Sequence, residues 1–260
     1  MCRKRRRKRY LHTQKSHSPG PVKVGMQRSC AAALLMGVLA AGCAGVSWTT
    51  DTNSVSPEET VILPEPRTES GVSVEEALNA RRSTRDYTGR QLSLADAGQI
   101  LWAAQGVTDN RGYRTAPSAG GLYPLEVYIV AGSVAEIEPG VYHYRPDGHL
   151  LIPVGTGDRR VALQAVAVNQ APVGDAPATI VIAAVPSRTT AKYGERGVHY
   201  VAMEAGHAAE NIYLQAEALD LATVVIGAFD DDGVRELIGL PEEVEPLYLM
   251  PVGHPIPGKG

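Results

Sequence analysis

The apolar run from Ala178 to Val185 constrains the fold of this chain most. Its residues read Ala-Thr-Ile-Val-Ile-Ala-Ala-Val, so Thr179 is the one polar side chain among them. A short run that is apolar at consecutive positions, rather than at alternate ones, is typical of a strand buried on both faces. We therefore expect a central strand here, and a second buried strand at Ala222 to Ile226 behind a long helix over residues 198–219.

Two helix signals precede this strand in the chain. Ser73-Val-Glu-Glu76 has the form of a capping box, in which a hydroxyl and a carboxylate three residues later cover free backbone amides. A helix is therefore expected from there to about Arg82. Ser93 opens a second box of this kind, and Gly106 is placed to end the helix that follows it.

The remaining elements alternate between strand and helix patterns, without an internal repeat. Strands are expected at residues 125–130, 141–144, 150–154 and 246–252, and further helices at residues 160–169 and 232–240. This order predicts an α+β fold around one sheet. The sequence contains neither a Gly-x-Gly-x-x-Gly motif nor a phosphate-loop lysine motif, so neither common nucleotide-binding fold is indicated.

Charge is distributed unevenly along the chain. Residues 1–28 hold ten of the 25 Lys and Arg side chains and no acidic one, which leaves 15 basic against 28 acidic residues beyond them, a net charge of −13. Such an acidic body repels a phosphate backbone, which excludes nucleic acid as its partner. The basic head is therefore interpreted as a targeting signal.

All three cysteines lie near the beginning of the chain, at Cys2, Cys30 and Cys43, which excludes disulfides and cysteine chemistry from the rest. The apolar stretch from Cys30 to Gly45 is too short to span a bilayer and has the character of a signal-peptide core. Its ending, Leu39-Ala-Ala-Gly-Cys43, resembles the lipobox of bacterial lipoproteins, whose cysteine is acylated. This resemblance predicts a lipid anchor at Cys43 and a place in the bacterial cell envelope, outside the cytoplasm.

These signals divide the chain into three parts. Residues 1–43 are expected to be a basic head with a lipoprotein-type signal peptide. Residues 44–68 are rich in Ser, Thr, Pro and Glu without an apolar period, which predicts a disordered tether. Residues 69–260 are predicted to form the functional domain.

Three arginines and two hydroxyls gather where the first expected helix ends, in Arg81-Arg82-Ser83-Thr84-Arg85. Guanidinium groups donate paired hydrogen bonds in a fork, and hydroxyls add shorter ones, so the cluster suits a phosphate monoester. A solvated helix end, favoured by the helix dipole, is the alternative interpretation.

A second segment reads Ala116-Pro-Ser-Ala-Gly-Gly-Leu-Tyr-Pro124. Its glycines allow backbone to approach a flat ligand closely, and Ser118 offers a hydrogen bond. A turn that leads into a strand is the alternative explanation of its Gly and Pro residues.

The two segments together resemble the nitroreductase family, in particular its SagB-type branch. The resemblance covers about 190 residues and includes further matching segments at Lys192–Arg196, Glu204–Gln215, Ile226–Gly227 and Pro251–Pro255. It implies a central, mainly antiparallel sheet flanked by helices, and a homodimer with FMN at the subunit interface. It also implies an oxidoreductase that moves two electrons between a small organic or peptide-derived substrate and an acceptor.

The resemblance assigns cofactor-binding roles to three groups of residues. The Arg-Arg-Ser-x-Arg turn of the family holds the FMN phosphate and ribityl chain, the Pro-Ser loop borders the isoalloxazine ring, and two backbone amides face the flavin N5 and O4 atoms. The matching residues are, respectively, Arg81, Arg82, Ser83 and Arg85; Pro117, Ser118, Gly120, Gly121 and Leu122; and Ile226 and Gly227.

The SagB-type branch also places a Lys-Tyr pair over the flavin, and Lys192-Tyr193 match it. A lysine can serve as a base when burial or a nearby cation, such as Arg196, lowers its pKa toward ambient pH. A tyrosine hydroxyl can relay a proton or stabilise charge. We therefore expect Lys192 and Tyr193 to be catalytic, with an ordinary surface loop as the alternative.

Other functions leave weaker signals. His207 and Glu210 have a spacing that metal sites use, but without a second ligand set the sequence predicts no metal site. Ala116-x-Ser118-x-Gly120 mimics a hydrolase nucleophile elbow with His254 following late, although the strand–turn–helix context is missing. A tethered flavin-binding module without catalysis is the remaining alternative.

Overall fold

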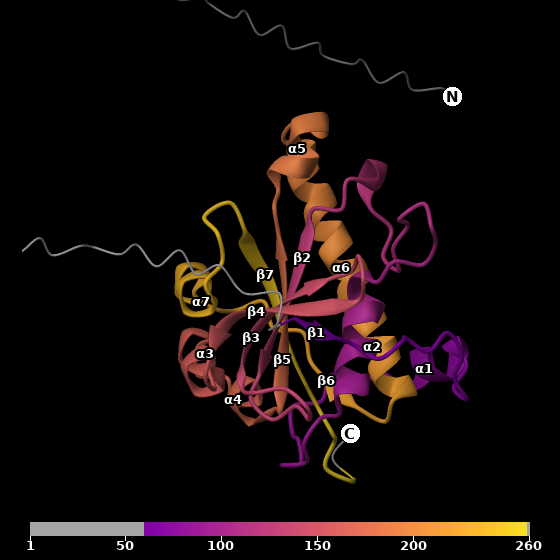
Figure 1. Ribbon diagram of the computed structural model, residues 1–260, viewed down its shortest axis with the longest axis vertical. Helices are drawn as coiled ribbons and strands as arrows, with labels where there is room; N and C mark the ends of the chain where they lie inside the picture. Colours follow the sequence, from indigo (N-terminus) through magenta and orange to yellow (C-terminus); the bar gives the residue numbers. More distant parts are fainter. Residues whose placement is uncertain (1–59, 259–260) are drawn as a thin grey trace, which may run out of the picture. The chain divides into compact units, whose positions relative to one another are not determined.

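The computed structural model describes residues 60–258, in which one seven-stranded sheet carries helices on both faces (Figure 1). The strand order is β1-β4-β3-β2-β5-β7-β6, and neighbouring strands pair antiparallel throughout. The strands are β1 Val61–Ile62, β2 Leu125–Ala131, β3 Gly140–Arg145, β4 Leu150–Thr156, β5 Ala178–Ala184, β6 Ala222–Thr223 and β7 Glu245–Gly253. The predicted α+β fold with a mainly antiparallel sheet is confirmed.

The helices include all five of those expected, together with three short ones that the sequence patterns did not indicate. They are α1 Val74–Ala80, α2 Leu94–Gln105, the 3-10 turn η2 Ala119–Gly121, α3 Arg160–Val166, α4 Ala171–Asp175, α5 Ser187–Tyr193, α6 Arg196–Ala218 and α7 Asp231–Ile238. Among the described residues, no helix combines the length and the apolar character that a membrane span requires.

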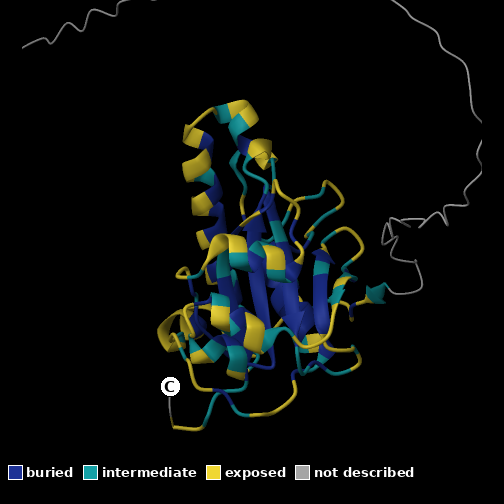
Figure 2. Ribbon diagram, turned by 90° about the vertical axis from the view of Figure 1, so that its left-hand side faces the viewer, coloured by how far each residue is buried: buried dark blue, intermediate teal, exposed yellow. Residues whose placement is uncertain are grey.

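The predicted central strand is β5, which lies between β2 and β7. All of its residues are buried, and they alternate between two cores. Ile180 and Ile182 pack with residues of α2 and α6, whereas Val181 and Ala183 pack with residues of α3 and α7. Figure 2 shows the strands as the buried centre of the molecule. Each large aliphatic side chain buried here contributes about 1.5–3 kcal/mol.

Local signals start the two N-terminal helices where the sequence predicts them. The Ser73 side chain accepts the N–H of Glu76, and the Glu76 carboxylate accepts the N–H of Ser73, so the capping box of α1 is complete. Ser93 also caps α2 by accepting the N–H of Asp96, but the Asp96 carboxylate accepts the Ser93 hydroxyl and not its backbone N–H, so the second predicted box is not completed. Gly106 ends α2, where a Cβ atom would lie 2.1 Å from Trp102, so the turn requires glycine.

The structure differs from the predictions at two strands. The strand expected over 222–226 is limited to β6, followed by an isolated bridge between Ile226 and Leu249, because the Val225 N–H donates to the Tyr213 hydroxyl at 2.8 Å and leaves the ladder. Residues 60–68, predicted as the end of the tether, include β1, which pairs with β4, and the buried Leu63. The folded domain therefore extends further toward the N-terminus than the sequence predicts.

The predicted signal peptide, the lipid anchor at Cys43 and the rest of the tether lie outside the described residues.

The strand register gives the sheet two ends that matter for function. At one end Leu125, the first residue of β2, pairs with Ala184, the last residue of β5. Because η2 precedes β2 and α5 follows β5, both lie at this end, and α5 is seen at the top of Figure 1. At the other end Ala178 pairs with Val252, which in turn pairs with Thr223 of the edge strand β6. We call these the Leu125 end and the Ala178 end.

Candidate functional site

The Pro-Ser loop, residues 117–122, lies at the Leu125 end of the sheet. The Ser118 hydroxyl accepts the backbone N–H of Tyr123 at 2.9 Å, which closes the loop over η2. Gly120 and Gly121 have φ angles of 66° and 65°, in the left-handed region that favours glycine. The other residues predicted here are surface or half-buried: Pro117 and Leu122.

The predicted catalytic pair lies against this loop. Lys192 and Tyr193 form the last turn of the short helix α5, where Lys192 is exposed and Tyr193 is half-buried. A Cβ atom at Gly120 would lie 2.7 Å from the Tyr193 hydroxyl and 3.0 Å from the Lys192 ammonium nitrogen. Tyr193 also packs edge to face on Tyr200, with ring centroids 5.2 Å apart. The fold thus brings Lys192, Tyr193 and the glycines of the Pro-Ser loop together.

Glu204 is a further residue at this place, to which the sequence assigned no role. It lies on α6 with 2% of its surface exposed, near enough to Ser118 for that side chain to favour its ionised form. Its Oε1 atom has no hydrogen-bond partner within the described part of the chain. Burial raises the pKa of Glu204 to about 7, against the opposing effects of Ser118 and Arg114. A carboxyl group of this kind can hold or release a proton near neutral pH.

One sequence signal could have indicated Glu204. The buried stripe of α6 includes Val201, Ala205, Ala208 and Ile212, and Glu204 occupies a position on that stripe. Carboxylates are rarely buried unless they are paired, so a Glu on the apolar side of a predicted helix indicates a functional group.

The arginine turn, residues 81–85, lies at the Ala178 end of the sheet beside β6. Ser83 forms a bridge with Thr223, and its hydroxyl lies 2.9 Å from the Tyr213 hydroxyl. The Arg81 guanidinium lies 5.1 Å from the centre of the Tyr213 ring and 3.8 Å from the Glu210 carboxylate. Ser83 is exposed and Arg81 half-buried, so both are accessible to an anion.

The other two arginines of the turn differ in their contacts. Arg82 folds back and donates to the carbonyls of Asn79, Ala80 and Arg81, at 3.0, 3.3 and 2.8 Å. Arg82 therefore caps the C-terminal end of α1, which agrees with the alternative interpretation of this segment as a solvated helix end. Arg85 is exposed, with one 3.5 Å contact to the Ser83 carbonyl. Arg81, Ser83 and Arg85 together fit a phosphate group.

The arginine turn and the Pro-Ser loop do not meet within one protomer. Both are held by α6, the turn through Tyr213 and the loop through Glu204, which are nine residues apart. At about 1.5 Å of rise per residue this separation is roughly 14 Å along the helix. The two predicted halves of the site thus lie at opposite ends of the sheet.

The predicted backbone donors can be distinguished in the structure. The Ile226 N–H donates to the Leu249 carbonyl at 2.9 Å and is therefore engaged within the sheet. Gly227 is exposed beside the Tyr248 ring. The contact argues against Ile226 as an amide donor to a ligand and leaves Gly227 as the accessible position.

The hydrolase alternative is inconsistent with the register of the sheet. Ser118 precedes β2 at the Leu125 end, whereas His254 follows β7 at the Ala178 end. A strand of the length of β5 separates them, roughly 20 Å at about 3.3 Å per residue. These two residues therefore cannot form a nucleophile–base pair.

His207 and Glu210, whose spacing alone does not predict a metal site, lie on the outer face of α6. His207 and Glu210 are both exposed, and Glu210 faces Arg81. Among the described residues, no group of three His, Cys, Asp or Glu side chains is arranged to hold a metal ion.

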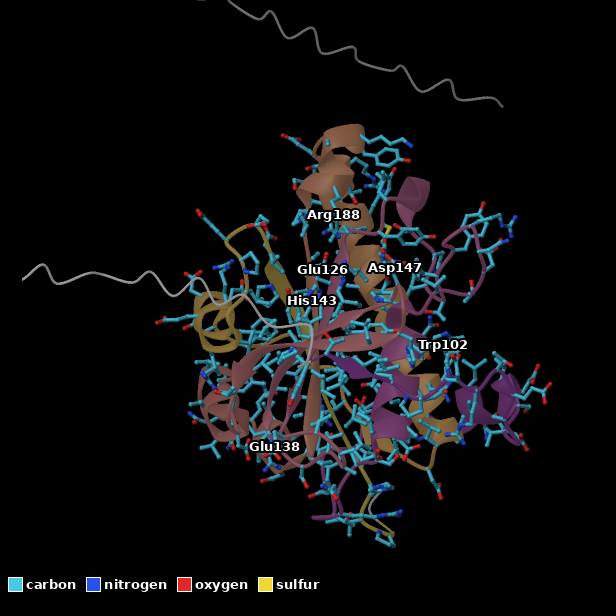
Figure 3. The ribbon with its side chains drawn as sticks, viewed as in Figure 1. Trp102, Glu126, Glu138, His143, Asp147 and Arg188 are labelled. Atoms are coloured by element: carbon cyan, nitrogen blue, oxygen red, sulfur yellow. The ribbon has the colours of Figure 1, made fainter. Side chains whose placement is uncertain are left out.

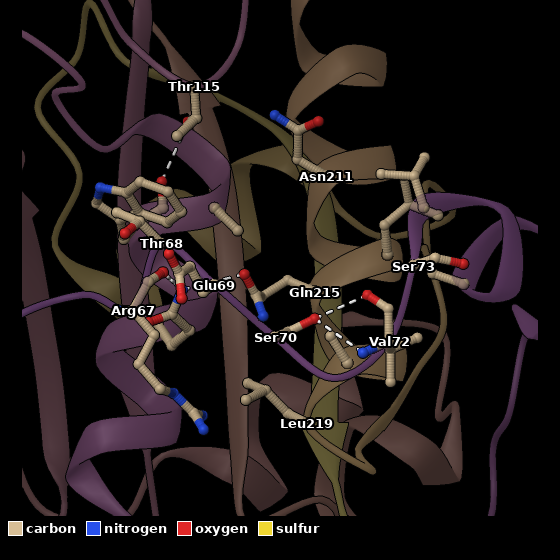
Figure 4. Close-up of a pocket in the computed structure, with 17 residues that line it drawn as sticks. Arg67, Thr68, Glu69, Ser70, Val72, Ser73, Thr115, Asn211, Gln215 and Leu219 are labelled. Atoms are coloured by element: carbon tan, nitrogen blue, oxygen red, sulfur yellow. Dashed lines mark hydrogen bonds between the residues drawn. The ribbon is translucent and has the colours of Figure 1, made fainter.

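Two cavities lie outside these clusters. One of about 360 Å³ opens between residues 67–74, α1, α2 and α6 (Figure 4). Gln99 there bonds to the backbone of Arg67 and to Gln215. The other, of about 460 Å³, surrounds Glu126 and His143 of β2 and β3. Neither is lined by the predicted cofactor-binding or catalytic residues.

The structure thus combines an antiparallel sheet between two helical layers with an arginine-bearing turn and a glycine-bearing loop that both lie against one long helix. A family model described as the nitroreductase family matches residues 78–254, and the chain belongs to that family. Members of this family are typically homodimers that act on small substrates.

Individual relatives agree with this assignment. A Methanocaldococcus jannaschii protein named as a candidate nitroreductase is 44% identical over 185 residues, which cover 71% of this chain and 92% of the relative. A crystal structure of a candidate nitroreductase from Ralstonia eutropha aligns with a TM-score of 0.67 and 31% identity, covering 76% of this chain and 90% of the other. A chain of the Escherichia coli microcin synthetase complex McbBCD, solved with truncated pro-microcin bound, aligns with a TM-score of 0.59 and 25% identity, covering 74% and 77%.

Proposed function

We propose that this protein is a SagB-type, FMN-dependent oxidoreductase that moves two electrons between a small organic or peptide-derived substrate and an acceptor. The observation that carries the proposal is the position of Lys192 and Tyr193 directly against Gly120 of the Pro-Ser loop. The similarity to a chain of a peptide-processing synthetase supports a substrate of this class.

The residues of this chain have distinct parts in that reaction. Arg81, Ser83 and Arg85 would hold the phosphate of FMN by charge-assisted hydrogen bonds. The backbone at Gly120 and Gly121 lets a flat ring approach the loop without a side chain in between. When bound, FMN supplies the acceptor and donor of an electron pair.

The proton chemistry belongs to the end of α5. Oxidation of a carbon–heteroatom bond requires a base for one proton, and Lys192 is in place to take it. The Tyr193 hydroxyl, packed beside Lys192 against the loop, would orient the substrate or stabilise developing charge.

A homodimer would complete the site. The arginine turn and the Pro-Ser loop of one protomer are too far apart for close contact with one another, so a second copy can bring its own loop to the first copy's turn. Helix α6 offers a surface for this contact, because Val198 and Met203 are 57% and 50% exposed. Light scattering should give twice the protomer mass, and a monomer that still holds flavin would overturn this part of the proposal.

The decisive experiment is the visible spectrum of the purified protein, followed by mass identification of the released chromophore. A yellow protein that releases FMN and is reduced and reoxidised in the presence of substrate supports the proposal. A colourless protein that takes up no FMN at high excess overturns it. A yellow protein without turnover toward nitroaromatic, quinone or azoline substrates would indicate a flavin-binding module instead.

We further propose that Cys43 carries a lipid anchor that holds the domain at the cell envelope, with residues 44–59 as its tether. The lipobox-like ending of the apolar stretch supports this. Metabolic labelling with a fatty acid should mark the protein and be lost in Cys43→Ser. Cys30→Ser, at the start of the same stretch, is the matched control and should keep the label. Equal labelling of both variants would contradict the anchor.

A further inference from the structure

We propose that Glu204 is a positioning residue that decides whether the Ser118 hydroxyl points its proton inward or toward a ligand on the Pro-Ser loop. The inference rests on the proposed function, because the ligand concerned is the flavin ring.

The hydrogen-bonding capacity of Ser118 makes this a two-state arrangement. A serine hydroxyl has one proton to donate and two lone pairs to accept with. One lone pair already accepts the Tyr123 N–H at 2.9 Å. When Glu204 is ionised it accepts the only proton of Ser118, which leaves no donor for a ligand. When Glu204 is neutral, its own O–H donates to the second lone pair, and the Ser118 proton is free to point outward.

The environment of Glu204 keeps both states accessible. The carboxyl group is 2% exposed, and its Oε1 atom has no partner within the described residues, so burial disfavours the ionised form. The Ser118 hydrogen bond and the charge of Arg114 favour the ionised form, and the balance brings the pKa of Glu204 to about 7. The carboxyl group therefore exchanges its proton in the neutral range.

The other charged groups around this part of α6 are held elsewhere or lie across the loop. Arg114 donates to Gln105 at 2.9 Å and lies over the Tyr123 ring. The remaining titratable groups on the elements packed against α6 are Glu75 and Glu76 of α1, Asp96 of α2, Glu126 and Tyr128 of β2, Arg188, Lys192 and Tyr193 of α5, and Glu245 and Tyr248 of β7, while β5 has none. Glu126 is engaged with His143 and Arg188, which leaves Lys192 and Tyr193 as the groups on the ligand side of the loop.

The consequence is a hydrogen-bond donor that is present below neutral pH and withdrawn above it. A ring bound against the Pro-Ser loop presents carbonyl and imine acceptors, which Ser118 can serve only while Glu204 is neutral. One hydrogen bond of this kind changes the dissociation constant by about three- to tenfold.

The test is the dissociation constant of FMN, measured by fluorescence quenching from pH 6 to pH 8. Glu204→Gln replaces the carboxyl by an amide that donates to Ser118 at every pH. The ratio of the wild-type constant to that of Glu204→Gln cancels the titration of the FMN phosphate itself. This ratio is expected to rise about three- to tenfold from pH 6 to pH 8, with a midpoint near 7.

Controls separate this role from a merely structural one. Glu217→Gln, a carboxyl on the same helix away from the loop, should follow the wild type at every pH. Ser118→Ala should bind FMN more weakly and lose the pH-dependent step, which keeps the test open if Glu204→Gln fails to fold. Parallel curves for wild type, Glu204→Gln and Ser118→Ala would overturn the inference while FMN binding stands. FMN binding to none of them at any pH would remove the proposed function, and this inference with it.

Discussion

Two carboxyl groups shielded from solvent on opposite sides of the Leu125 end of the sheet show how partners decide what such a group does. Glu126 of β2 lies 2.6 Å from His143 and 2.5 Å from Arg188 (Figure 3). Burial raises the pKa of Glu126, but the hydrogen bonds and charges of His143 and Arg188 outweigh it and leave the pKa below its ordinary value. At Glu204 only Ser118 and Arg114 favour the ionised form, burial outweighs them, and the pKa is raised to about 7.

The difference separates a cluster with a structural role from one proposed to take part in the reaction. We call the second one, Ser118, Gly120, Lys192, Tyr193 and Glu204, the chemical cluster. Glu126, His143 and Arg188, which we call the Glu126 cluster, have satisfied charges, and the Tyr128 ring stacks on His143 at 4.4 Å. Such a cluster holds β2, β3 and α5 together. A buried carboxyl that only Ser118 and Arg114 help to ionise, as at Glu204, holds its proton up to neutral pH instead. Changes to the two regions should therefore affect different measurements.

The largest effect is expected at the chemical cluster. Lys192→Ala should lower turnover by about a hundred- to ten-thousandfold, because the reaction loses its base, and Tyr193→Phe should lower it less. Flavin content and the free energy of unfolding should stay near those of the wild type. The measurement is the rate at which the substrate reduces the bound flavin in the absence of oxygen, together with steady-state turnover per bound flavin. Full turnover in both variants with flavin bound would remove the catalytic assignment.

The Glu126 cluster should show the opposite result. Glu126→Gln removes the charge and one of the two oxygens that face Arg188 and His143, which should cost about 1–3 kcal/mol of the free energy of unfolding. Urea denaturation measures this change. Turnover per bound flavin should stay unchanged. A Glu126→Gln variant with wild-type stability but reduced turnover would show that Glu126 takes part in the reaction, and the two clusters would then not differ in role.

Much of the fold could be predicted from the sequence because its signals are local. Ser73 and Ser93 cap α1 and α2 through bonds within three residues, and the apolar run at β5 indicates burial on both faces. Helix α5 was missed because it is short and begins after Pro186 without a side-chain cap. The strand expected to end at Ile226 was cut short by a hydroxyl from a distant helix, which no local pattern reveals.

The candidate site divides in the same way. The arginine turn is visible in the sequence because its chemistry lies in one short segment. The contact of Lys192 and Tyr193 with Gly120 joins residues about 70 positions apart, and only the family resemblance pointed to that pair. The place of Glu204 on the apolar stripe of α6 can be read from the sequence, whereas the lack of a partner for its Oε1 atom among the described residues is a property of the packed structure.

The two carboxyl groups should also respond oppositely to pH. The folded-state pKa of Glu204 lies above its unfolded value of about 4.3, so its contribution to stability is complete below that value and is lost as pH rises through about 7. The folded-state pKa of Glu126 is depressed, so its contribution is present above the unfolded value and is lost as pH falls through the folded pKa.

Variants without each carboxyl make this difference measurable. Between pH 5 and pH 8 the wild type should lose about 2 kcal/mol relative to Glu204→Gln. Toward pH 3 it should lose its advantage over Glu126→Gln. Thermal unfolding across this range, with flavin removed, is the measurement. A wild type that gains on Glu204→Gln as pH rises would show that Glu204 is ionised and paired, like Glu126.

The smallest effect concerns the backbone that holds the chemical cluster. Gly120 and Gly112 both have positive φ, 66° and 79°, so Ala at either position costs about 1 kcal/mol of the free energy of unfolding. An added methyl at Gly112 meets no described atom within 4 Å, whereas at Gly120 it lies 2.7 Å from the Tyr193 hydroxyl. Gly112→Ala thus controls for the backbone strain, and the excess effect of Gly120→Ala reports the contact alone.

That excess should appear in turnover more than in stability. Tyr193 sits near the end of a short helix and can swing away from an added methyl at a cost of about 1 kcal/mol, but doing so moves its hydroxyl off the loop. Gly120→Ala should therefore lower turnover about tenfold below Gly112→Ala, while melting temperatures of the two stay close. Equal turnover in the two variants would mean that the contact between Tyr193 and the loop is only packing. The residues around the Pro-Ser loop would then have a structural role, as the Glu126 cluster does.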